Sequence, residues 1–513
     1  MRDKINTLKN KIKDMEELVK IITSLHTEGK KIVQCHGAFD LLHIGHIRHL
    51  EQARRKGDVL VVTVTADRYV NKGPHRPAFS ENLRAEAIAA LNCVDYVAIN
   101  KWPTAVEAIQ LLKPDLYIKG SEYKVAEKDC TGAITLEEAA VKSVGGQLVF
   151  TDDITFSSSG LINRHLTFFS KETSDYLTDF SARYSFADVI QFLENSHTLK
   201  VLVIGEAIVD EYQYCEAIGK SSKEPMLALK FLSTEKFSGG ILAIANHIAN
   251  FCGNVSLITF LGTDNSQEEF IRRNLNSNIE KIFLQRKDSP TIVKRRFIEN
   301  YFFTKFLEVY EINDLPLDKA DNDKLCATLS DQVSKYDLVI VADFGHSMMT
   351  KEAIDILCNK ARFLCLNVQA NAGNRGYHTV SKYPRADYVC MVENEIRLEA
   401  RDRYGDLKQL IIDVSQMLKC KRVAVTRGKY GCLCYNEDKG FFDIPAFAGQ
   451  VLDRMGAGDA FFSLTALCVA QDAPMEIVGF IGNAAGAQAV ATVGHRKSIE
   501  RVPLFKQIES LLK

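Results

Sequence analysis

The sequence has almost no net charge. Its 64 lysines and arginines against 65 aspartates and glutamates, in 513 residues, leave a formal charge of −1. Binding to nucleic acid requires a basic stripe, and the basic clusters are no longer than Lys9–Lys13 or Arg54–Lys56. We therefore expect these clusters to be solvated helix faces and expect no nucleic-acid partner.

The sequence also lacks paired cysteines and a continuous apolar segment. None of its 13 cysteines stands in a Cys-x-x-Cys pair, which argues against a zinc or redox site of that kind. The longest uncharged run, residues 477–494, is interrupted by glycines and polar residues, so it predicts a buried helix and no membrane contact. The first twenty residues are charged, unlike a signal peptide, and the expected location is cytoplasmic.

What the sequence does contain is two series of short apolar runs separated by helical stretches. Such alternation predicts parallel sheets in two doubly wound α/β domains. Residues 1–30 are expected to form a helical lead, 31–165 the first domain, 166–197 a helical connector and 198–513 the second domain, in which residues 224–232 and 291–306 suggest a small β lid. The expected strands of the first domain are 31–35, 59–65, 96–99, 116–119 and 147–150; those of the second are 201–204, 255–260, 338–342, 363–367, 388–391 and 422–426.

The first expected strand runs into a motif suited to binding phosphate. After Cys35 comes His-Gly-Ala-Phe-Asp-Leu-Leu-His-Ile-Gly-His, followed by a helix. Ligands of such sheets bind at the carboxyl ends of strands, where a helix N-terminus offers unpaired N–H groups to an anion. His43 and His46 share one face of the first turn, and Gly37 and Gly45 permit close approach to the backbone. A pair of capping or core histidines is the structural alternative.

This motif resembles the signature of the cytidylyltransferase-like nucleotidyltransferases. The similarity continues through Lys72-Gly73, Arg76-Pro77, Arg84 and Lys119-Gly120, and is greatest to the adenylyltransferase half of the bifunctional heptose-7-phosphate kinase/heptose-1-phosphate adenylyltransferase. The class I aminoacyl-tRNA synthetases share the His-Ile-Gly-His string, but no Lys-Met-Ser-Lys-Ser-like loop is present. The resemblance implies catalytic roles for His43 and His46 and nucleotide or phosphate binding by Gly37, Phe39, Asp40, Gly45, Lys72, Lys119, Ser157, Ser158 and Ser159.

A second motif, Asp453-Arg-Met-Gly-Ala-Gly-Asp459, precedes an apolar helix near the end of the sequence. Phosphoryl transfer to a hydroxyl requires a base beside that hydroxyl and N–H donors for the transferring group. Asp459 is the candidate base, and Gly456, Ala457 and Gly458 form the candidate anion hole. An acidic residue in a first helical turn is also ordinary capping, so the motif alone is weak.

The second motif resembles the signature of the ribokinase (PfkB-type) sugar kinases, and further parts of that pattern occur in order. The resemblance implies sugar binding by Asp210, Gly239, Gly240, Asn246, Lys294 and Arg296, and nucleotide binding by Asn394, Glu395, Thr426, Gly428 and Asn483. It also implies ATP as phosphoryl donor and Mg²⁺ bound through the nucleotide phosphates, with Glu395 as a further ligand. Four segments depart from the expected pattern: Arg454-Met455, Asn367-Val368-Gln369 and Asp343-Phe344-Gly345-His346 differ from the sugar kinases, and residues 219–225 differ from the heptose kinases.

Together the resemblances imply a bifunctional transferase whose domain order is the reverse of the usual heptose enzyme. The expected product is a nucleotide-activated heptose of the ADP-heptose type for surface glycan synthesis, with ATP or CTP as nucleotidyl donor. The expected partners are sugar phosphates, nucleotides and a second copy of the chain. The alternatives are the same chemistry on another sugar or alditol phosphate, and a sensor with one inactive half.

Overall fold

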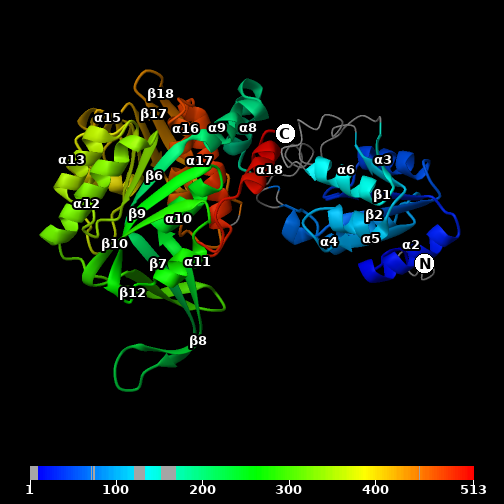
Figure 1. Ribbon diagram of the computed structural model, residues 1–513, viewed down its shortest axis with the longest axis horizontal. Coiled ribbons are helices and arrows are strands. Elements are labelled where there is room, and N and C mark those ends of the chain that lie inside the picture. Colours follow the sequence, from blue (N-terminus) through cyan, green and yellow to red (C-terminus); the bar gives the residue numbers. More distant parts are fainter. Residues whose placement is uncertain (1–9, 71, 73–75, 121–132, 152–168, 450) are drawn as a thin grey trace. The chain divides into compact units, whose positions relative to one another are not determined.

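The computed structural model describes residues 10–70, 72, 76–120, 133–151, 169–449 and 451–513 (Figure 1). Its contacts divide the chain into two compact units, residues 1–181 with 502–513, and residues 182–501. Within the described residues, no helix is both long and apolar enough to cross a membrane. The fold class is confirmed as α/β with two parallel-sheet domains, whereas the exact domain limits stay a prediction.

The first unit contains a five-stranded parallel sheet in the order β3-β2-β1-β4-β5. Strands β1 and β2 are buried because both faces of the sheet are covered by helices, which explains their continuous apolar runs. The strands are β1 (Ile32–Gly37), β2 (Val59–Thr65), β3 (Tyr96–Asn100), β4 (Leu116–Lys119) and β5 (Gln147–Phe150), and the helices are α2 (Met15–Thr27), α3 (Ile44–Arg54), α4 (Glu81–Ala89), α5 (Val106–Leu112), α6 (Ala133–Ser143), α8 (Lys171–Arg183, which continues to the unit boundary) and α18 (Arg501–Leu511).

The second unit is built on a nine-stranded sheet in the order β10-β9-β6-β13-β14-β15-β16-β17-β18. Its first seven strands are parallel, and β17 and β18 are antiparallel additions at one edge. The strands are β6 (Lys200–Gly205), β9 (Asn254–Asp264), β10 (Ile279–Pro290), β13 (Leu338–Asp343), β14 (Leu364–Val368), β15 (Tyr388–Val392), β16 (Arg422–Thr426), β17 (Cys432–Asn436) and β18 (Gly440–Ile444).

Helices cover both faces of this sheet (Figure 1). Helices α10 (Ile241–Ala249), α16 (Ala457–Val469) and α17 (Met475–Val490) pack together on one face. On the other face, α12 (Lys319–Gln332), α13 (Lys351–Lys360) and α15 (Leu407–Met417) contribute to one large apolar core with the strands. The remaining helices are α9 (Phe186–Asn195), α11 (Glu268–Asn274) and α14 (Glu393–Ala400). Helix α17 contains residues 477–490 of the uncharged run and is almost entirely buried, as the sequence predicts.

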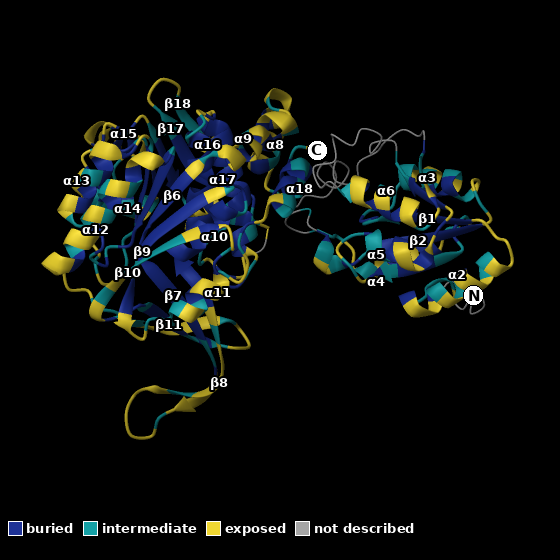
Figure 2. Ribbon diagram, in the orientation of Figure 1, coloured by how far each residue is buried: buried dark blue, intermediate teal, exposed yellow. Residues whose placement is uncertain are grey.

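A second, four-stranded sheet in the order β12-β11-β7-β8 corresponds to the expected β insertion. Strands β7 (Ala207–Lys220) and β8 (Leu227–Gly240) form a long antiparallel pair whose distal end is exposed (Figure 2). Strands β11 (Ile292–Glu299) and β12 (Thr304–Glu311) complete this sheet. The near end of the pair is buried around Tyr212, Phe237, Ile298 and Val493.

Phe462 on α16 should be a major source of stability in the second unit because its side chain is fully buried. We expect Phe462→Ala to lower the free energy of unfolding by about 3–5 kcal/mol, since the truncation leaves a cavity. Phe302→Ala is the matched control, because Phe302 is 77% exposed. Chemical denaturation followed by circular dichroism measures both, and equal unfolding midpoints would contradict this account of the core.

Candidate active sites

The first candidate site lies where the strand order of the first unit changes direction. Strand β1 pairs with β2 on one side and β4 on the other, so the strand order reverses between β1 and β4. The general rule for open α/β sheets places a ligand crevice outside the carboxyl ends of two such strands. Strand β1 ends at Gly37, β4 ends at Lys119, and α3 begins after His43. The predicted phosphate motif therefore stands at the position where such sheets bind ligands.

His43 and His46 stack on each other at the start of α3, with ring centroids 3.9 Å apart. His43 Nδ1 accepts a hydrogen bond from the backbone N–H of Gly45 at 3.1 Å, so the capping interpretation is correct for this nitrogen. Burial lowers the pKa of His43. The pKa of His46 is lowered to about 3, mainly by burial and further by the nearby His43 and Lys72. Both rings are thus neutral near pH 7, and an anion bound beside them would raise their pKa values again.

Asp40 and Arg84 hold the loops around this helix start. Asp40 Oδ1 accepts the N–H of Ala78 at 2.6 Å, and its other oxygen lies 3.4 Å from Arg76. The guanidinium of the buried Arg84 donates to the carbonyl of Thr65 at 2.7 Å and also to the carbonyl of Ala38. Asp40 is therefore a positioning residue for the motif in this structure, and the organising role of Arg84 was not predicted.

The two predicted lysines have different surroundings. Lys119 Nζ lies 2.9 Å from Glu137 Oε2, and both side chains are largely buried. Burial lowers the pKa of Lys72 to about 8. Two further histidines were not predicted: His36 contacts the hydroxyls of Thr63 and Thr65 at 3.0 and 3.2 Å, and His49 contacts that of Thr151 at 3.0 Å. Ser157, Ser158 and Ser159 lie outside the described residues.

The second candidate site is at the N-terminus of α16, in the second unit. Gly456 caps this helix with φ 81°, so the first-turn N–H groups of Ala457, Gly458 and Asp459 precede the first helical hydrogen bond, which Ala460 donates. Asp459 in that turn is buried. The turn therefore combines a carboxylate with several N–H donors, the combination that the second motif predicts.

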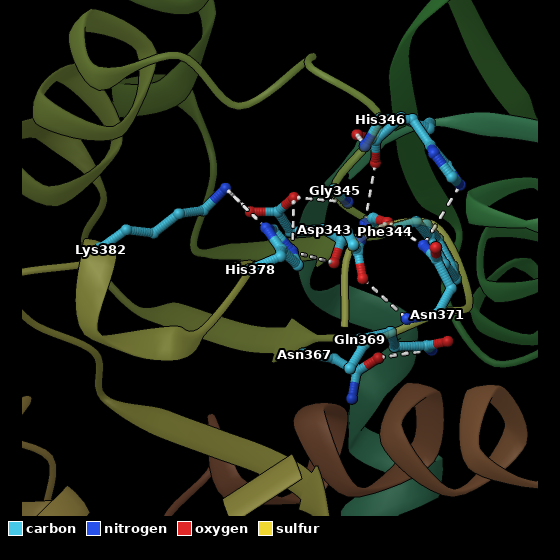
Figure 3. Close-up of polar contacts among 12 residues, drawn as sticks. Asp343, Phe344, Gly345, His346, Asn367, Gln369, Asn371, His378 and Lys382 are labelled. Atoms are coloured by element: carbon cyan, nitrogen blue, oxygen red, sulfur yellow. Dashed lines mark hydrogen bonds and ion pairs between the residues drawn. The ribbon is translucent and has the colours of Figure 1, made fainter. Parts of the chain in front are cut away.

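Gln369 and His495 lie on either side of the Asp459 carboxylate. Gln369 Nε2 donates to Oδ1 at 2.9 Å, and His495 Nε2 lies 3.7 Å from Oδ2. Burial raises the pKa of Asp459, while His495 and Gln369 oppose this rise. Gln369 belongs to a segment that departs from the family pattern, so neither its role nor that of His495 was predicted. Figure 3 shows Gln369 also bonded to Asn367, which holds the amide in place.

The predicted sugar-binding residues Asp210, Gly239 and Arg296 gather near the same carboxylate. Asp210 is on β7 of the small sheet, where its Oδ1 accepts from Arg296 at 2.5 Å and its Oδ2 lies 3.8 Å from His495. A Cβ atom on Gly239 would lie 2.0 Å from Asp210 Oδ2, so only glycine fits there. The next residue, Gly240, caps α10.

Two other predicted sugar-binding residues are placed differently. Lys294 is buried, with its Nζ 5.0 Å from the centre of the Tyr310 ring, and burial lowers its pKa. The Asn246 side chain bonds to the carbonyl of Asn274 and the N–H of Asn276, both at 2.9 Å. Asn246 therefore holds a neighbouring loop, and its contact with sugar stays a prediction.

A buried polar network supports the crevice between β6 and β13, where the order of the large sheet changes direction. Figure 3 shows Lys382 and His378 directed at Asp343, at 2.6 and 3.3 Å from its carboxylate oxygens. Glu206 accepts the N–H groups of Phe344 and His346, both at 3.0 Å. Burial and Asp343 raise the pKa of Glu206 to about 7. This network fixes the Asp343–His346 segment, which also departs from the family pattern.

The predicted nucleotide-binding residues lie on separate elements of the second unit. Glu395 accepts the N–H groups of Val392 and Ala370 at 2.8 and 3.1 Å, and burial raises its pKa to about 7. Asn394 is exposed in the first turn of α14, and Thr426 ends β16 shortly before Gly428. The Asn483 amide donates to the carbonyls of Ile444, the last residue of β18, and Pro445, so it holds the end of that strand.

Asp453 connects the helix turn to the small sheet. Its buried carboxylate accepts from Tyr212 at 2.7 Å and Lys305 at 2.5 Å, and from the N–H groups of Met455 and Gly494. Burial alone would raise the pKa of Asp453, but Lys305 and Tyr212 hold it below its ordinary value. Residues far apart in sequence thereby fix the Met455–Gly456 turn.

Comparison with known proteins identifies both parts of the chain. Residues 35–165 match the cytidylyltransferase-like family, and residues 198–501 match the pfkB family carbohydrate kinases, in the order that the sequence predicts. The bifunctional protein HldE of Citrifermentans bemidjiense is 42% identical over 118 residues, which are 23% of this chain and 24% of that protein. HldE of Aliarcobacter butzleri is 43% identical over 139 residues, which are 26% of this chain and 29% of that protein.

These matches span less than a third of the length of either relative. Among solved structures, phosphofructokinase-2 from Escherichia coli in complex with potassium aligns with 62% of this chain and 99% of its own, with a TM-score of 0.50 and 15% identity. At that identity the likeness concerns the fold, which agrees with the doubly wound second unit.

Gly456 should be required for the geometry of the α16 turn. Its φ is left-handed, and a Cβ atom there would lie 2.5 Å from the His495 ring. We expect Gly456→Ala to destabilise the second unit by about 1–3 kcal/mol. Gly458→Ala is the matched control, because a Cβ atom on Gly458 meets no atom within 4 Å. Urea denaturation compares the two, and equal loss of stability in both variants would contradict the prediction.

Proposed function

The chain belongs to the pfkB family of carbohydrate kinases, and from this premise we propose that it is a bifunctional transferase. The second unit would be a sugar kinase and the first a sugar-1-phosphate nucleotidyltransferase. The observation that carries the proposal is the buried Asp459 carboxylate beside the first-turn N–H groups of α16. The stacked His43 and His46 at the start of α3 support the second activity.

In the kinase reaction, Asp459 would accept the proton of the acceptor hydroxyl while the hydroxyl oxygen attacks the γ-phosphorus of ATP. The bond between the γ-phosphorus and the oxygen that bridges it to the β-phosphate breaks, and ADP leaves. The N–H groups of Ala457 and Gly458 would donate to the oxygens of the transferring group, where negative charge is concentrated. Gln369 would hold one Asp459 oxygen, so that the other faces the acceptor.

In the transferase reaction, a phosphate oxygen of the sugar 1-phosphate would attack the α-phosphorus of a nucleoside triphosphate, and pyrophosphate would leave. The N-terminus of α3 supplies N–H groups and a positive dipole for the phosphates. Neutral His43 and His46 would donate hydrogen bonds and gain positive character as charge develops on the phosphate. Lys119 would have to leave Glu137 to join them.

The described residues fit a magnesium ion held mainly by nucleotide phosphates. No group of three or more His, Cys, Asp or Glu suited to a metal occurs in the part of the chain that the structure describes. Mg²⁺ commonly uses only one or two carboxylates together with substrate phosphates, and the partly buried Glu395 could serve as one of them. When bound, the ion would neutralise charge on the phosphates, and Glu395 would hold it in its ionised form.

We propose a heptose phosphate as the acceptor and ADP-heptose as the final product, made in the cytoplasm for a surface glycan. The likeness to the HldE proteins and the resemblance of the sequence motifs to the heptose enzyme support this choice of sugar. After phosphorylation at the anomeric hydroxyl, a separate phosphatase would remove the distal phosphate before nucleotidyl transfer. CTP in place of ATP is the alternative nucleotidyl donor. Mass spectrometry of the products from a panel of nucleotides and sugar phosphates tests the donor and the sugar. Self-association of the chain stays a prediction.

Single substitutions should separate the two activities. We expect Asp459→Asn to lower the kinase rate on the order of 10²–10⁴-fold, because it removes the base. His46→Ala should lower nucleotidyl transfer about 10²-fold by removing a donor to the phosphates. Coupled assays of ADP and pyrophosphate release measure both rates, and each variant is the control for the other. An unchanged kinase rate in Asp459→Asn would remove Asp459 as the base, whereas absence of kinase turnover in the parent protein would favour the sensor.

The hydrogen bond from Gln369 should set the acid limb of the kinase pH profile. This bond stabilises the charged form of Asp459, so its loss in Gln369→Leu raises the Asp459 pKa further. A base must be deprotonated to act, so we expect the acid limb of kcat to move to higher pH. Gln416→Leu, at an exposed position on α15, is the control. An acid limb at the same pH in both variants would remove Gln369 from this role.

A further inference from the structure

His495 lies between two carboxylates of the second candidate site, on the segment that follows α17. Its Nε2 is 3.7 Å from Asp459 Oδ2 and 3.8 Å from Asp210 Oδ2. These distances exceed those of ordinary hydrogen bonds, but a ligand oxygen beside such a pair of atoms can lie about 2.8 Å from both. The imidazole and the two carboxylates therefore border a position that an oxygen of the acceptor can occupy.

Neighbouring contacts hold this ring in place, and none of them uses its nitrogens. Gly494 donates its N–H to Asp453 at 3.0 Å, and the guanidinium of Arg496 donates two hydrogen bonds to Glu235. The imidazole also packs against the glycine that caps α16, where a Cβ atom would lie 2.5 Å from it. The side chain is only 7% exposed, and neither ring nitrogen hydrogen-bonds to a residue that the structure describes. A buried donor without a partner is costly, so His495 is suited to a ligand that accepts a hydrogen bond.

Hydrogen-bonding capacity distinguishes His495 from the carboxylates beside it. Ionised Asp210 and Asp459 only accept hydrogen bonds. Their negative charge favours the ring proton on Nε2, the nitrogen that faces them, so Nε2–H is a donor. Two adjacent sugar hydroxyls match this set, because each can donate to one carboxylate and their oxygens retain lone pairs for the imidazole donor. Asp459 is reserved for the attacking hydroxyl, which leaves Asp210 and His495 for its neighbour.

We propose that His495 is a specificity-determining residue of the kinase, an inference that rests on the proposed sugar kinase activity. Its Nε2–H donates to the oxygen of the hydroxyl next to the phosphorylated anomeric position, and Asp210 accepts a hydrogen bond from that same hydroxyl. These two contacts turn the attacking hydroxyl toward Asp459. An analogue without the neighbouring hydroxyl leaves the imidazole donor unpaired, so the site selects against it.

Two sugars and three variants of the full chain test this contact. For heptose 7-phosphate and its 2-deoxy analogue, kcat/KM is measured by turnover, and Kd by isothermal titration with a non-hydrolysable ATP analogue present. We expect the parent protein to favour the first sugar about 10–100-fold in both measurements. His495→Leu should lose most of this preference, because the donor and the hydroxyl belong to one contact. His495→Gln keeps an N–H at the reach of Nε2 and should retain part of the preference, whereas the shorter amide of His495→Asn should not.

His197→Leu, at an exposed histidine of the second unit, is the matched control and should keep the full preference. A role of His495 in folding alone would weaken both sugars alike, so an equal preference in the parent protein and His495→Leu would overturn the contact. His495→Asn takes the place of the leucine variant in this comparison if the latter does not fold. A preference in Kd that depends on His495, without turnover, would overturn the kinase and keep the contact, whereas turnover with a preference that all variants share would do the reverse. Absence of both binding and turnover of either sugar by the parent protein would overturn both.

Discussion

A carboxylate removed from water must be paired or hydrogen-bonded, and the second unit is organised around four that obey this constraint. Asp210 is held by Arg296, Asp343 by Lys382, Asp453 by Lys305, and Asp459 by Gln369. Of these four, Asp459 alone forms no ion pair with a lysine or arginine in the described structure. Burial raises the pKa of Asp459, whereas Lys305 and Tyr212 hold that of Asp453 below its ordinary value. This difference agrees with the proposed role of Asp459 as a base and with Asp453 as a structural anchor.

The first unit satisfies the corresponding constraint for cations by keeping its histidines neutral. Burial lowers the pKa values of His36 and His46 to about 3 and that of His49 to about 4. The crevice can therefore be lined with imidazoles without mutual repulsion. Arg84 is the exception: it is buried and charged, and its donors are satisfied by the carbonyls of the loops that it holds and by Asp67. With neutral rings and a fixed guanidinium, the attraction for phosphate is left to the helix N-terminus and to the predicted lysines Lys72 and Lys119.

The sequence was informative wherever local pattern determines structure. The strands at 59–65, 116–119, 147–150 and 422–426 are found at the predicted residues, because a buried parallel strand needs a continuous apolar run ended by turn residues. The helix turn at Gly456 was equally predictable. The roles of Gln369 and His495 could not be predicted. These residues are about 90 and 36 positions from Asp459 in the sequence, and the order of the strands in the sheet decides whether they reach its carboxylate. The predicted Asn246 was placed on α10, but its amide serves a loop whose position no local pattern reveals.

The bonds of Asp453 have a consequence for how the second unit comes apart. Tyr212 and Lys305 belong to the small sheet, whereas Met455 precedes α16 by two residues, and all three bond to one buried carboxylate. Local opening of the small sheet would remove the lysine and tyrosine partners of that charge and leave it in a poorly hydrated position. The sheet and the start of α16 therefore belong to one cooperative unit of unfolding, despite about 150 residues of intervening chain.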